Sequence, residues 1–160
     1  MAFDAFLKLD GVDGESQVRG HENEIEVVSF SFGVTQTGTG SSGGGGGAGR
    51  ASFQDFNYVS AIHKGSPSLL KICASGEHIK SATLTVRKVA GQAFEFIKLK
   101  LEDILVSSYL PAGAAGDEAP SEQVSLNFNK IEFSYVTQNA DGSAGATNTV
   151  GWDVLRNVST

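Results

Sequence analysis

The chain has 160 residues, of which 40% are hydrophobic and 19% charged, and its formal net charge is −6. This length suits one domain with a core that needs no disulfide, and the single cysteine, Cys73, excludes an intramolecular one. The basic residues are scattered, so we expect no nucleic-acid partner. No apolar run approaches the ~18 residues of a membrane helix, so we expect no membrane insertion.

Alternating segments at residues 3–9 and 25–37 predict the first two strands. In the second strand, alternate residues are apolar and so form one apolar face: Val28, Phe30, Phe32 and Val34. The residues between them are small and mostly carry hydroxyl groups: Ser29, Ser31, Gly33 and Thr35. This small polar face is either the solvent side of an ordinary sheet or the wall of a channel or shared surface.

A glycine-rich loop follows, because eight of the twenty glycines lie between Gly38 and Gly49. Strand-like segments flank it at residues 25–37 and 50–59, yet a hairpin needs only a few residues to turn. No side chain in the loop is large enough to build a core, and glycine is costly to order. We interpret the loop as an extension that contacts something outside its own domain; the alternative is a plain surface loop or spacer.

The second half of the chain predicts one helix and several long strands. Ser66 as N-cap, Pro67 at the first helical position and Gly76 at the end predict a helix of about nine residues. Further strands are expected at residues 80–89, 94–106 and 124–136, and a last one contains Trp152. The apolar phase changes within the second and third of these strands, which predicts a β-bulge or bend in each.

Together these elements predict a single domain over residues 1–160 with a mainly β fold. We expect seven or eight strands in a β-barrel-like pair of packed antiparallel sheets, with one short α-helix on the flank. The loop at residues 111–120 is small and acidic. Barrel edges must be closed, covered or paired with a neighbour.

Two motifs in the glycine-rich loop match known sites only by spacing. Gly38, Gly40 and Gly43 fit G-x-G-x-x-G, and Gly40, Ser42 and Gly44 fit G-x-S-x-G. A dinucleotide site and a nucleophile elbow both need a helix after the motif, whereas a strand is expected here. Neither motif therefore indicates a cofactor or a catalytic serine.

The ionisable residues give no catalytic or metal pattern either. His21, His63 and His78 do not pair with another ligand residue at metal-binding spacing. Glu102 and Asp103 are neighbours on a strand and so are expected to point to opposite faces. We expect a protein that is not an enzyme and that binds no cofactor or metal.

A series of short motifs resembles the Hcp (haemolysin-coregulated protein) family, the tube protein of type VI secretion. In chain order they are Phe3–Leu9 with Gly14-Glu15-Ser16, Ile25–Val28 with Phe30–Val34, Gly43–Arg50 with Phe53–Phe56, Ser66-Pro67 with Cys73–Gly76 and His78, Lys100–Asp103 with Val106-Ser107-Ser108, and Gly151-Trp152-Asp153. The resemblance covers essentially the whole chain and departs mainly in the loops at residues 91–93 and 111–120.

The resemblance implies a tail-tube-like fold and an assembly. Family members form homohexameric rings with a wide central hole, and the rings stack into the inner tube of a contractile apparatus with sheath and spike proteins. Small effector proteins can ride inside the ring. The protein is cytoplasmic before assembly and is released outside the cell; the acidic N-terminal segment leads us to expect export without a cleaved signal peptide.

The resemblance and the residues together suggest two candidate surfaces. We expect Ser29 and Ser31 to line the lumen. We expect the glycine-rich loop and the residue after it to form the contact between stacked rings: Gly38, Thr39, Gly40, Ser41, Ser42, Gly43, Gly44, Gly45, Gly46, Gly47, Ala48, Gly49 and Arg50. The alternative function is a small-molecule-binding β-barrel whose glycine-rich loop is a lid.

Overall fold

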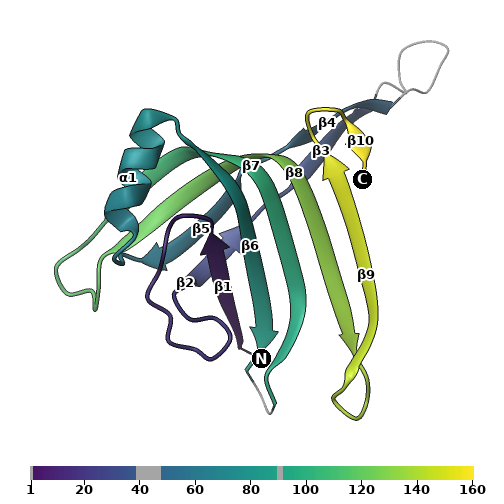
Figure 1. The fold of residues 1–160 in the computed structure, drawn as a ribbon, viewed down its shortest axis with the longest axis horizontal. Coiled ribbons are helices and arrows are strands. Elements are labelled where there is room, and N and C mark those ends of the chain that lie inside the picture. Colours follow the sequence, from purple (N-terminus) through teal and green to yellow (C-terminus); the bar gives the residue numbers. More distant parts are fainter. Residues whose placement is uncertain (1, 39–47, 90–91) are drawn as a thin grey trace.

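In the part of the chain that the structure describes, the protein folds as a closed antiparallel barrel of six strands with additional strands and one helix (Figure 1). The structure is a computed structural model that describes residues 2–38, 48–89 and 92–160. The barrel order is β8-β5-β2-β1-β6-β7, and β7 pairs again with β8. Its strands are β1 (Phe3–Leu9), β2 (Ile25–Ser31), β5 (Phe56–Ala61), β6 (His78–Lys88), β7 (Phe94–Ala112) and β8 (Ser121–Gln138). The prediction of a mainly β, barrel-like fold with one short helix is confirmed.

The remaining strands lie outside the barrel. β9 (Ala144–Asp153) and the short β10 (Val158–Ser159) extend the sheet beyond β8. β3 (Val34–Gly38) and β4 (Ala48–Phe53) form a separate two-stranded hairpin that projects from the barrel in Figure 1. We call β3 and β4 the arm.

Each long strand predicted beside the glycine-rich loop is in fact two strands, one in the barrel and one in the arm. The segment 25–37 breaks at Phe32 and Gly33, and the segment 50–59 breaks at Gln54 and Asp55. The two breaks lie opposite each other, since the Gln54 N–H donates to the Gly33 carbonyl at 2.9 Å. The paired strands β2 and β5 therefore belong to the barrel, and beyond the two breaks the same pair of segments continues out of the barrel as β3 and β4.

The predicted phase changes in the two longest strands are confirmed. In β8 the buried positions pass from Phe128 to Ile131, and the register of β7 against β6 shifts next to Phe96. β7 changes phase again at Asp103, whose φ of 53° is left-handed. These irregularities let β7 and β8 bend, so that one strand serves both the barrel and the sheet that leads to β9.

Two valines assigned to the core face of β2 and β3 are instead exposed. The register of β2 against β5 shifts between Val27 and Ser29, so Val28 lies in a bulge and is 71% exposed. Val34 lies beyond the break and is 55% exposed. Phe30 and Phe32 do pack against the core, as expected.

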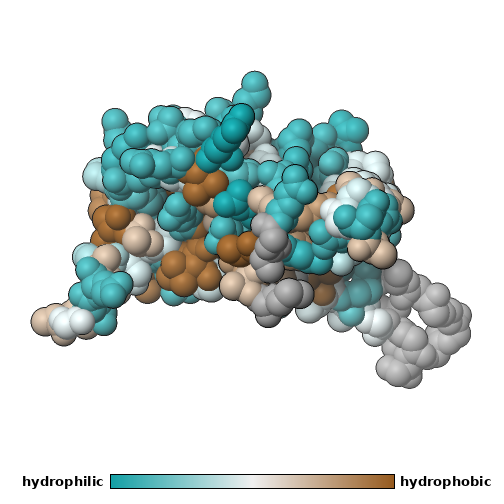
Figure 2. Space-filling view, turned by 90° about the horizontal axis from the view of Figure 1, so that it is seen from below, coloured by the Kyte–Doolittle hydropathy of each residue, from teal (hydrophilic) through white to brown (hydrophobic). Residues whose placement is uncertain are grey.

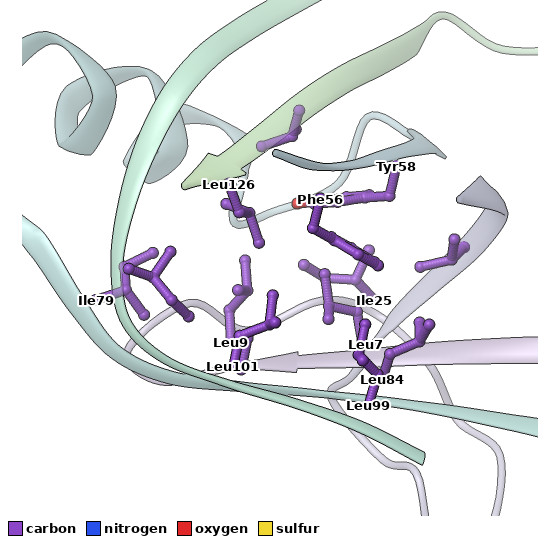
Figure 3. Close-up of a cluster of buried hydrophobic side chains, with 14 of the residues drawn as sticks. Leu7, Leu9, Ile25, Phe56, Tyr58, Ile79, Leu84, Leu99, Leu101 and Leu126 are labelled. Carbon is purple, nitrogen blue, oxygen red and sulfur yellow. The ribbon is translucent and has the colours of Figure 1, made fainter. Parts of the chain in front are cut away.

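The core fills the barrel interior. Side chains from opposite walls point toward one another in Figure 3, among them Leu7 and Ile25 on one side and Phe56 and Leu126 on the other. Each of these four is 1% exposed or less, and burying such a side chain contributes about 1.5–3 kcal/mol. Cys73 is partly buried against this core, in line with its interpretation as a small hydrophobic residue.

α1 (Ser66–Ser75) covers one side of the barrel (Figure 1). Gly76 ends it in the left-handed conformation, as predicted, and donates its N–H to the Ile72 carbonyl at 3.0 Å. The predicted N-cap is wrong, because Gly65 takes that position and Ser66 is the first helical residue. A Cβ at Gly65 would lie 2.5 Å from the Asp13 carbonyl oxygen, so the close approach of the β1–β2 connection requires glycine there.

Candidate assembly surfaces

The arm holds the predicted ring-stacking residues that the structure describes. Residues 39–47 of the glycine-rich loop lie outside the described residues. All of β3 is exposed. A Cβ on Gly49 would lie 2.7 Å from the Thr37 carbonyl oxygen, so glycine permits the close approach of the two strands. The arm is therefore a narrow pair of closely spaced strands, of which β3 is exposed to solvent.

Arg50, within β4, joins the arm to the turn after β9. Its guanidinium donates to the Val154 carbonyl at 3.2 Å and to the Leu155 carbonyl at 3.3 Å, in the turn after β9. The predicted stacking residue thus makes contacts within its own chain. These bonds fix the direction in which the arm leaves the barrel.

Replacing Arg50 by alanine should loosen the arm without unfolding the barrel. We expect faster hydrogen exchange in residues 34–38 and 48–53, and a change in unfolding free energy within about 0.5 kcal/mol because the contacts are exposed. Mass spectrometry of exchanged peptides measures both strands. Arg19→Ala, at an exposed position in another loop, is the control; unchanged exchange in the arm of R50A would contradict the anchoring role.

An apolar hollow of about 350 Å³ lies where the arm meets the barrel. Aromatic rings from the arm, its base and the outer sheet line it: Phe32, Phe53, Phe133 and Trp152. Phe32 and Phe133 contact each other with ring centroids 5.6 Å apart. Figure 2 shows that hydrophobic surface on the face it views is divided into several patches within a hydrophilic surface.

The predicted lumen residues lie on an outer face of the barrel whose strand residues are mostly small and polar. Ser29 and Ser31 of β2 are both exposed, and their partners across β5 are Val59 and Asn57. The same face continues over β8 and β7 with outward residues Gln123, Ser125, Ser108 and Leu110. We call this surface, on β2, β5, β8 and the second half of β7, the polar face.

Hydrogen bonds tie the polar face together around one carboxylate. Asp55 accepts from the Ser107 hydroxyl at 2.6 Å and from the Asn127 amide at 3.0 Å. The Ser125 hydroxyl donates to the Asn57 side chain. Side chains held by such bonds keep a fixed surface shape.

Two unpaired strand edges bound the polar face. β2 pairs with β1 only up to Val27, and β7 pairs with β6 only up to Leu105. Among the described strands, none pairs with the outer edge of β2 at residues 28–31 or of β7 at residues 106–112. Both edges carry an exposed apolar side chain, Val28 at 71% and Leu110 at 58%. Edges of this kind can pair with another chain.

A buried polar cluster, which sequence reasoning missed, holds α1 beside the β7 edge. Glu122 is 1% exposed and accepts from the Tyr109 hydroxyl at 2.7 Å and the Ser60 hydroxyl at 3.2 Å. His63 Nε2 lies 3.0 Å from the same carboxylate. The Gly65 N–H donates to His63 Nδ1, which leaves Nε2 as the donor toward Glu122.

The hydrogen bonds in this cluster decide its protonation. Burial opposes ionisation of Glu122, but bonds from His63, Tyr109 and Ser66 outweigh it and hold the pKa of Glu122 below its ordinary 4.5. Burial and the Glu122 charge raise the pKa of Tyr58 above its ordinary value. The cluster contains serine, histidine and glutamate, but Ser60 donates to Glu122 and not to the histidine, so it lacks the nucleophile–base pair of a hydrolase.

The described residues hold neither a metal cluster nor a membrane-spanning helix. Within residues 2–38, 48–89 and 92–160, no three His, Cys, Asp or Glu side chains gather where they could hold a metal ion. In the same ranges, no helix has the length and hydropathy needed to cross a membrane. His78 instead bonds to Asp103, which also accepts from Asn129 at the bend of β7 and β8.

Comparison with known proteins gives concordant matches. The family model "Type VI secretion system effector, Hcp" matches residues 6–135. Protein hcp1 of Pseudomonas aeruginosa is 44% identical over 160 residues, which are 99% of either chain. The crystal structure of Hcp1 from Salmonella typhimurium superposes with a TM-score of 0.85 at 37% identity and full coverage of both chains. A structure described as a type six secretion system protein reaches 0.93 at 30% identity, covering 99% of this chain and 100% of that one.

Proposed function

Because the chain belongs to the Hcp family of type VI secretion system proteins, we propose that it is a structural subunit of the secretion tube. In this proposal six copies form a ring, and rings stack. The observation that supports it best is the pair of unpaired edges, on β2 and β7, at opposite sides of the polar face. Two different edges of one subunit allow a head-to-tail contact, which closes into a ring when the rotation per subunit is right.

The polar face would then line the central hole. Joining the β2 edge of one copy to the β7 edge of the next makes the polar faces continuous around the ring. Ser29 and Ser31 would lie in that lumen, beside the fixed Asn57 and Ser125 side chains. A wall of small hydroxyl and amide groups suits cargo that must pass without binding tightly, such as small effector proteins.

The arm would make the contact between rings. It projects from the barrel, and Arg50 bonds it to the turn after β9. In the proposed role, the stacked rings lie within a sheath and under a spike. The protein is cytoplasmic before assembly and is released outside the cell afterwards.

The proposal is tested by the mass of the purified protein in solution, with negative-stain images of the same sample. A mass six times that of the chain and open rings in projection are expected; a monomer over a wide concentration range would contradict the proposal. The alternative, a small-molecule-binding barrel with a glycine-rich lid, needs an open interior. Leu7, Leu99 and Phe56 fill the interior of this barrel.

A further inference from the structure

The connection between β1 and β2, residues 10–24, forms a compact strap across the barrel. Three backbone bonds join its two halves, from Gly14 N to Asn23 O, Ser16 N to Glu24 O and Asn23 N to Ser16 O, at 2.8–3.0 Å. Toward α1, Glu15 accepts from the Lys64 N–H at 3.1 Å. Near its other end, His21 contacts β7.

His21 lies between two carboxylates. Its Nδ1 is 3.0 Å from Glu24 Oε1 in the strap, and its Nε2 is 2.8 Å from Glu95 Oε1 on β7. The ring is 6% exposed and stacks on Phe6 with the centroids 4.5 Å apart and the planes at 6°. The His21 ring and the Arg87 guanidinium therefore both cover Phe6, which is 2% exposed although it is not part of the barrel core.

The two contacts fix the number of protons on the ring. An ionised carboxylate only accepts hydrogen bonds, so each nitrogen must donate. An imidazole has two N–H groups only when it is protonated, and a neutral ring leaves one nitrogen lone pair facing a carboxylate. The arrangement is complete only for a charged His21.

Other charges around His21 also favour a cation. Arg87 is a nearby cation: its guanidinium lies 5.2 Å from the Phe6 ring, and it is paired with Asp4 at 3.3 Å and lies across the ladder from Glu95. Two carboxylates contact the His21 ring, Glu24 of the strap and Glu95 of β7. Glu22 is the next residue in the chain, and Glu26 of β2 lies opposite Phe6 in the ladder.

We propose that His21 is a proton-dependent latch that holds the strap against β7 when the ring is protonated and releases it when the proton is lost. Loss of the proton turns one of the two attractive contacts into a contact between two acceptors. The latch lies within one chain, and its test does not depend on ring formation.

Hydrogen exchange of the full chain at about pH 6 and pH 8, corrected for intrinsic rates, tests the latch. We expect protection of the amides in residues 12–24 to be about fivefold lower at the higher pH. Glu95→Gln should abolish this difference, because the glutamine amide can donate to a neutral ring nitrogen. NMR of the His21 ring should show protons on both nitrogens at the lower pH.

Glu22→Gln is the matched control. Glu22 belongs to the strap and accepts from the Gly20 N–H at 3.0 Å, but His21 bonds to Glu24 and Glu95. This variant makes the same change of charge and should keep the pH difference of the unmodified protein. Equal protection at both pH values in the unmodified protein, or an undiminished pH difference in E95Q, would overturn the proposal.

Discussion

Replacing Glu122 by alanine is expected to lower the free energy of unfolding by about 3–5 kcal/mol. The change removes the acceptor shared by His63, Ser60 and Tyr109, and leaves buried donors without a partner. It also separates the start of α1 from β7 and β8. Denaturant unfolding followed by circular dichroism measures the loss.

Glu118→Ala is the control for this prediction, since Glu118 is an exposed residue of the loop just before β8. Its effect should stay within about 0.5 kcal/mol. Similar losses for the two variants would show that the buried cluster does not stabilise the fold.

The same cluster predicts an acid dependence of stability. The pKa of Glu122 is lower in the folded protein than its ordinary 4.5, so the carboxylate stabilises the fold above that pH. This contribution is lost as the pH falls below 4.5 toward the folded-state pKa. Glu122→Gln should therefore be less stable than the unmodified protein at neutral pH, with a smaller difference in acid.

Replacing Leu110 by glutamate is expected to reduce the mass in solution from six chains to one. The side chain is 58% exposed in the single chain, so the fold should tolerate the change. In the proposed ring it lies on the lumen-facing side of the β7 edge, beside the β2 edge of the next copy, where a carboxylate would be partly desolvated and would lose the apolar contact of leucine in each of the six contacts. Light scattering measures the mass, and circular dichroism checks the fold.

Leu70→Glu provides the comparison, because Leu70 is 56% exposed and belongs to α1 rather than to either strand edge. Its ring should persist. A hexamer of L110E would place the ring contact elsewhere and remove the argument for the polar face as the lumen.

Local patterns predicted the elements of this fold well. Alternation in residues 3–9 and 25–37, the phase change in β8 and the Pro67–Gly76 helix signals each depend on near neighbours in the chain. The bulge at Val28 could not be predicted from the sequence. A bulge is an extra residue in one strand relative to its partner, so it can be recognised only when the pairing of β2 with β5 is known. Val34 is exposed for a different reason, because it lies beyond the break that separates β3 from β2.

The buried cluster and the latch could not be predicted from local patterns at all. Glu122 meets His63 because β5 pairs with β8, and His21 meets Glu95 because β1 and β7 both flank β6. Single histidines and glutamates give no signal of such pairings in one sequence. The resemblance to a family predicted the fold and the class of protein, whereas the role of Arg50 as an anchor emerged only from its contacts with Val154 and Leu155.

The strand order also has a consequence for how the chain acquires its structure. β6 to β9 follow one another as neighbours, but β1 pairs with β6 across roughly 80 residues, as in Leu7 with Leu84. At a synthesis rate of about 5–20 residues per second, an apolar strand waits roughly 4–16 s for its partner. Distant pairings of this kind slow folding. One edge of β1 can pair early with β2, whereas its other edge stays open until β6 has been made, and a chaperone that shields that open edge should raise the yield of folded protein.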